Sequence, residues 1–119
     1  MIGRISIRVF LTKSLTLIIV NELKDHIAQI NKLCDTHDVR SLFAFGSIVS
    51  GKLNSQSDID LIVDIKSKDP LDYSDNYFAL KFELESILNR PIDLLESKAV
   101  KNPFLKNQID STKVLVYGR

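Results

Sequence analysis

Apolar residues recur along the chain at two spacings, one typical of helices and one typical of strands. Four of them, Leu23, Ile27, Ile30 and Leu33, lie three or four residues apart, which predicts an amphipathic helix from Asn21, a suitable N-cap, to about Asp35. A longer stripe predicts a second helix from Asp69-Pro70 to about Asn89. Two short helices are predicted at 48–53 and 104–109, and four apolar runs predict strands at 39–45, 58–65, 92–95 and 113–117.

Helices and strands therefore alternate along the whole of this pattern. That order predicts an α/β (α+β) layer fold, in which a mixed sheet of about four strands is flanked by helices. There is no repeat and no linker rich in Gly, Pro or Ser, so residues 21–119 are predicted to form one domain. Residues 1–20 are predicted to be an N-terminal extension, which is either an added strand or helix turn or a segment with little structure.

Composition narrows the class of protein further. The 119 residues carry 16 basic and 15 acidic side chains, and a net charge of +1 argues against non-specific binding of duplex DNA as the main activity. The single cysteine, Cys34, cannot pair within the chain and is predicted to be a small buried residue in a cytoplasmic protein. The longest uncharged run near the start, Ser14 to Asn21, has 8 residues, whereas a membrane-spanning helix needs about 20.

Two aspartates mark the predicted strand at 58–65. Because side chains alternate along a strand, Asp58 and Asp60 share one face, with Cα atoms about 6.6 Å apart, while Ile59 and Leu61 point into the core. Two neighbouring carboxylates repel each other and resist burial, and a divalent cation bound between them removes that penalty. Oxygen ligands alone favour Mg²⁺ or Mn²⁺ over zinc.

A third carboxylate lies in the strand that follows the long helix. Asp93 stands between apolar neighbours, so it points to the face that they avoid. If its strand pairs with the Asp58 strand, three carboxylates converge and can hold two cations about 3.5–4 Å apart, an arrangement that supports displacement at phosphorus. Asp64 lies farther along the same face, and a surface or helix-capping role is predicted for it.

Gly46 and Ser47 occupy a predicted turn from strand to helix. Free backbone N–H groups at such a turn bind phosphate, glycine permits close approach of the backbone, and the serine hydroxyl adds a donor. Lys52 is a candidate phosphate ligand, although a surface lysine is an equally good interpretation.

These residues have a recognisable spacing. Gly46-Ser47, ten residues and then Asp58-Ile59-Asp60 resemble the G-S-x10-D-x-D signature of the DNA polymerase β-like nucleotidyltransferase superfamily. With their neighbours they read FGS…G…SDIDLIV, which is similar to the minimal nucleotidyltransferases (MNT), and the resemblance extends over about residues 21–117. In one respect the chain departs from that pattern, since Ile48-Val49-Ser50 lacks the arginine that family members often carry before the next glycine.

The resemblance implies a polymerase β-like fold and roles for particular residues. Gly46 and Ser47 would bind the nucleotide triphosphate, while Asp58, Asp60 and Asp93 would be the catalytic residues and would bind Mg²⁺. Asp93 would also help to deprotonate the attacking hydroxyl. The partner that the resemblance implies is a HEPN-type ribonuclease toxin, with this chain as the antitoxin that moves AMP from ATP to a hydroxyl, such as that of a tyrosine, on the toxin.

Two other functions stay open on the sequence alone. A nucleotidyltransferase fold with weak or no catalysis could neutralise a partner by occlusion, and the missing arginine favours this alternative. Modification of a small molecule such as an aminoglycoside is a third possibility, but it needs a second domain or a cleft built by a dimer.

Overall fold

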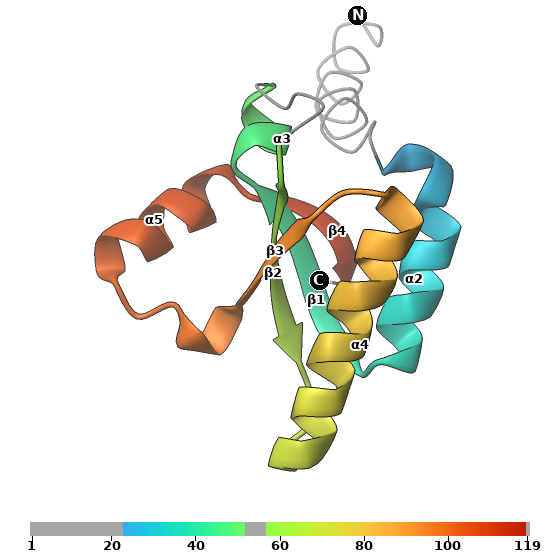
Figure 1. The fold of residues 1–119 in the computed structure, drawn as a ribbon. Coiled ribbons are helices and arrows are strands. Elements are labelled where there is room, and N and C mark those ends of the chain that lie inside the picture. Colours follow the sequence, from blue (N-terminus) through green and yellow to red (C-terminus); the bar gives the residue numbers. More distant parts are fainter. Residues whose placement is uncertain (1–22, 52–56, 119) are drawn as a thin grey trace, which may run out of the picture.

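The computed structural model describes residues 23–51 and 57–118 (Figure 1). The predicted N-terminal extension, the cap at Asn21 and the position of Lys52 lie outside these ranges.

A four-stranded mixed sheet forms the centre of the described fold. Its spatial order is β3-β2-β1-β4, with β1 antiparallel to both β2 and β4, and with β2 parallel to β3. The strands are β1 (Val39–Phe45), β2 (Ile59–Ile65), β3 (Ile92–Glu96) and β4 (Val114–Gly118). The predicted mixed sheet of about four strands is therefore confirmed.

Helices lie on both sides of this sheet (Figure 1). The long helix α4 begins where Asp69 accepts a hydrogen bond from the backbone N–H of Asp72 at 3.1 Å, and it ends at Asn89 in the left-handed conformation. Asn102 caps α5 in the same way, accepting from the backbone N–H of Phe104 at 2.9 Å. The helical elements are η1 (Lys24–His26), α2 (Ile27–Thr36), α3 (Ser47–Ser50), α4 (Pro70–Leu88), η2 (Ser97–Ala99) and α5 (Pro103–Thr112).

The hydrophobic core lies between the sheet and the helices α2 and α4. Alternate residues of β2 point into it, so that Ile59, Leu61 and Val63 are at most 1% exposed. Leu80 and Leu84 of α4 close the core from the other side, and Cys34 of α2 is buried beside them, as predicted. We call this side of the sheet the covered face.

The opposite side of the sheet, which we call the open face, is overlaid only in part by the residues that the structure describes. Helix α5 lies on this side, away from α2 and α4 (Figure 1). The side chains that point to the open face are the other alternate residues of the strands, including Asp60, Ile62 and Asp64 of β2. The fold thus separates an apolar face from a face on which carboxylates gather.

Candidate active site

The end of β1 is shaped by Gly46. This residue has φ 75° and ψ −140°, a conformation that residues with a Cβ rarely adopt, and it leads directly into α3. A Cβ atom built on Gly46 would overlap the carboxylate of Asp60. Glycine is therefore needed here for its backbone conformation and for the close approach of Asp60.

Asp60 lies at the centre of the site. Its backbone pairs with Phe45 of β1 on one side and with Asp93 of β3 on the other. Partial burial, and then the negative charges of Asp93 and Asp58, raise the pKa of the Asp60 carboxyl above its ordinary value. A hydrogen bond from the backbone N–H of Ser47 opposes that shift. The Asp60 carboxylate therefore contacts the glycine–serine turn and also lies near the other two aspartates.

The structure brings all three predicted aspartates to one region. Because β2 and β3 are parallel and Asp60 is in register with Asp93, the two side chains leave the sheet on the same face. Asp58 immediately precedes β2, and its charge also acts on Asp60. Asp58 and Asp93 are exposed, whereas Asp60 is half-buried. The three carboxylates therefore come together because β2 and β3, the strands that α4 connects, pair in parallel.

The donor set suits a hard divalent cation. All three aspartates offer oxygen, and no ion pair joins any of them to a lysine or arginine in the described part of the chain. Within residues 23–51 and 57–118, however, no three His, Cys, Asp or Glu side chains are close enough together to enclose a metal ion. The carboxylates thus form an open, uncompensated negative site.

Comparison with known proteins identifies the family. The family model described as polymerase beta, nucleotidyltransferase matches residues 28–119. A candidate protein adenylyltransferase of Methanocaldococcus jannaschii is 31% identical over 98 residues, which cover 82% of this chain and 97% of the relative. The chain belongs to the polymerase β nucleotidyltransferase family.

Two solved structures support the fold of this nucleotidyltransferase. A minimal nucleotidyltransferase superposes with a TM-score of 0.67 at 24% identity, covering 80% of this chain and 93% of the other. A chain in the complex of a tri-AMPylated Shewanella oneidensis HEPN toxin with an MNT antitoxin superposes with a TM-score of 0.53 at 22% identity, covering 78% and 70%. The polymerase β-like fold predicted from the sequence motif is confirmed.

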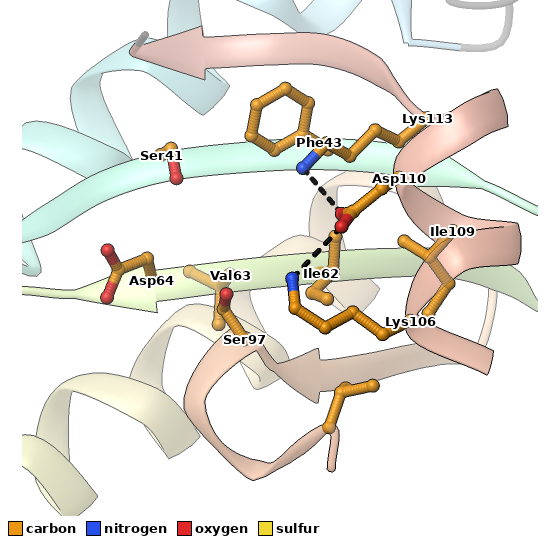
Figure 2. A pocket seen from close by; sticks show the side chains of 11 residues that line it. Ser41, Phe43, Ile62, Val63, Asp64, Ser97, Lys106, Ile109, Asp110 and Lys113 are labelled. Atoms are coloured by element: carbon orange, nitrogen blue, oxygen red, sulfur yellow. Dashed lines mark hydrogen bonds and ion pairs between the residues drawn. The ribbon is translucent and has the colours of Figure 1, made fainter. Parts of the chain in front are cut away.

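A hollow of about 240 Å³ lies beneath α5 on the open face of the nucleotidyltransferase sheet (Figure 2). Lys106 and Lys113 of its lining both bind Asp110, at 2.9 and 3.0 Å, and hold the pKa of the Asp110 carboxyl below its usual range. Lys113 also lies 4.4 Å from the centre of the Phe43 ring. We call this the Asp64 hollow, since Asp64 lines its other end (Figure 2).

Asp64 has a different setting from the surface or capping role predicted for it. Its side chain is only 20% exposed, its nearest cations are Arg40 Nε at 3.8 Å and Lys98 Nζ at 3.9 Å, and it caps none of the described helices. Its Oδ1 atom is buried and has no hydrogen-bond partner among the described residues. The sequence around Asp64 does not indicate this setting, because the cations that approach Asp64 come from β1 and from the segment after β3.

A second hollow, of about 360 Å³, adjoins Gly46 and has a mainly apolar lining. Four of its seven lining residues belong to α5, and one of these, Ile109, also lines the Asp64 hollow. Its lining is Phe45, Gly46, Ser50, Leu105, Gln108, Ile109 and Thr112, and we call it the Gly46 hollow. The sequence predicts only a short helix at 104–109 in this region and contains no motif that marks these residues as a binding site.

None of the helices in the described ranges combines the length and the apolar character that crossing a membrane requires.

Proposed function

We propose that this chain is a Mg²⁺-dependent nucleotidyltransferase that moves AMP from ATP to a hydroxyl of a partner protein. The observation that carries the proposal is the contact between Asp60 and the Gly46–Ser47 turn, with Asp58 and Asp93 alongside. A phosphate-binding turn and a carboxylate cluster are the two parts that transfer of a nucleotidyl group requires at one place.

Each residue takes a role that its position supports. Gly46 and Ser47 would bind the phosphates of ATP, while Asp58, Asp60 and Asp93 would hold Mg²⁺. When bound, the cation supplies the positive charge that stabilises the transferring group. Asp93 is exposed at the edge strand of the described sheet, where an incoming hydroxyl can reach its carboxylate and pass a proton to it. Asp60, held by the Ser47 N–H, orients the cluster against the turn.

We further propose that the partner is a HEPN-type toxin and that this chain acts as its antitoxin in the cytoplasm. The relative in M. jannaschii carries the name of a protein adenylyltransferase, and the S. oneidensis complex joins an MNT antitoxin to a tri-AMPylated HEPN toxin. The free, buried thiol of Cys34 suits a reducing compartment.

The test is transfer of label from [α-³²P]ATP to a HEPN-type partner in the presence of Mg²⁺. Wild-type protein should label the partner, and Asp60→Asn should reduce the rate by at least about a hundredfold, because it removes one charge from the centre of the cluster. Asp75→Asn, on the exposed side of α4, makes the same chemical change away from the site and should leave the rate unchanged. Wild-type protein that binds its partner tightly without labelling it would contradict the enzyme and support occlusion.

A further inference from the structure

The Gly46 hollow has the character of a binding site for a flat apolar ring. Phe45, Leu105 and Ile109 give it apolar walls, and its volume of about 360 Å³ falls within the roughly 300–1,000 Å³ that is usual for small-molecule sites. Ile109 is buried, while Leu105 remains 40% exposed at the mouth. An aromatic ring entering the hollow would therefore cover apolar surface that solvent now reaches.

We infer that the Gly46 hollow receives the adenine ring of the nucleotide, and that Gln108 selects it. This inference rests on the proposed function, which places the phosphates at Gly46 and Ser47. Gly46 lines the hollow, so a nucleotide held there by its phosphates brings its sugar and base to the opening. The base then lies between Phe45 of β1 and the α5 residues, on the same face as Asp60.

Gln108 supplies the polar contact that such a ring requires. Ser111 and Thr112 both donate to its main-chain carbonyl, at 3.1 and 2.8 Å, and its side-chain amide has no hydrogen bond within the described residues. A carboxamide offers an acceptor oxygen and a donor NH₂ group, which match the exocyclic amine and a ring nitrogen of adenine. The side-chain amide of Gln108 can therefore form hydrogen bonds with the base without breaking a hydrogen bond within the described protein.

The Asp64 hollow is a poorer place for the base. Lys106, Asp110 and Lys113 already satisfy one another there, and Lys113 lies over the Phe43 ring that a base would otherwise stack on. An uncharged ring entering it would have to displace these ion pairs. The volume of about 240 Å³ is also smaller than that of the Gly46 hollow.

Binding of two nucleotides that differ in a single group tests the assignment. We would measure the dissociation constants of ATP and of purine riboside triphosphate, which lacks the exocyclic amine, by titration calorimetry with Mg²⁺. Wild-type protein should prefer ATP by roughly tenfold, since one hydrogen bond to the base is lost in the analogue. Gln108→Leu should abolish this preference and leave the binding of inorganic triphosphate, which has no base, unchanged.

A matched control comes from the preceding residue of the same helix. Asn107 is exposed and does not line the hollow, so Asn107→Leu should keep the full preference for ATP. If wild-type protein binds both nucleotides but does not distinguish them, or if Gln108→Leu keeps the preference, the base site is wrong while the proposed function stands. Failure of wild-type protein to bind ATP and inorganic triphosphate alike would overturn both.

Discussion

Alternate residues of each strand point to opposite faces of the sheet, and the two faces differ in character, since one is apolar and the other carries carboxylates. On β2, Leu61 points to the covered face and is 1% exposed, whereas its neighbour Asp60 points to the open face beside two further carboxylates. The covered face meets α2 and α4 over a continuous apolar core, whereas the open face, as far as the structure describes the chain, is overlaid by α5 and η2 and leaves two hollows. The separation follows from the two-residue period of a strand.

The contrast between the faces shows how a small domain can maintain a site of mutually repelling carboxylates. Carboxylates that repel each other destabilise the folded state unless a ligand neutralises them, so the required free energy must come from elsewhere. The apolar residues of the covered face provide it, because burying them is favourable in proportion to their area. The two faces should therefore respond to substitution in opposite ways.

The largest effect is expected on the covered face. Leu61→Ala leaves a cavity between β2 and the helices and should lower the free energy of unfolding by about 2–5 kcal/mol. Urea denaturation followed by circular dichroism measures the change. Leu71→Ala removes the same atoms from a side chain that is 76% exposed, and it should change stability by less than about 0.5 kcal/mol. Equal losses in the two variants would show that Leu61 does not contribute to a packed core.

An intermediate effect is expected at the boundary between the faces, at Gly46. Gly46→Ala places a methyl group against the Asp60 carboxylate and forces a strained backbone, so it should cost about 2–3 kcal/mol. Gly51→Ala is the matched control, because Gly51 also has a positive φ but has open space around it. Strain alone should cost about 1 kcal/mol there. If both variants lose the same stability, contact with Asp60 does not matter for the fold.

A smaller, pH-dependent effect is expected from Cys34 in the core. Burial, followed by the negative charge of Asp35, raises the pKa of its thiol from 9.0 to about 12. The folded protein therefore holds this proton more tightly than the unfolded chain, and the resulting stability is complete below pH 9 and is lost as the pH rises from 9 to 12. Wild-type protein should lose about 1 kcal/mol more than Cys34→Ala between pH 8 and pH 10. Parallel stability curves for the two proteins would contradict this.

Most of the fold could be predicted because its signals are local. The run Val39–Phe45 is strand β1 residue for residue, and Asp69-Pro70 and Asn89 mark the ends of α4 within one residue. At the start of the described chain the agreement is looser, because a short 3₁₀ turn over Lys24–His26 precedes α2. The helix predicted at 104–109 extends over Pro103–Thr112.

The residues of the site could be predicted from strand alternation and from the glycine–serine turn, but their arrangement in space could not. Alternation along β2 and β3 predicts the face to which Asp60 and Asp93 point. That the two residues lie opposite each other depends on how α4 connects the two parallel strands. The two hollows depend on where α5 lies over the sheet, and the setting of Asp64 depends on Arg40 and Lys98 from other segments; no local pattern of residues encodes either. For that reason Gln108, on a polar helix with no motif around it, could not be identified from the sequence.

The smallest change in the free energy of unfolding is expected for Asp60→Asn. Unlike Leu61→Ala on the covered face, this substitution on the open face should not destabilise the protein. Without a divalent cation this change removes one of three mutually repelling charges, and the amide oxygen can still accept the hydrogen bond from the Ser47 N–H. The free energy of unfolding should therefore stay unchanged or rise, by less than about 1 kcal/mol. Millimolar Mg²⁺ should then raise the melting temperature of wild-type protein and of Asp75→Asn but not that of Asp60→Asn, because a ligand stabilises only the state that binds it. A destabilised Asp60→Asn protein in EDTA, or one that gains more from Mg²⁺ than wild type does, would mean that Asp60 serves the fold rather than the cation site.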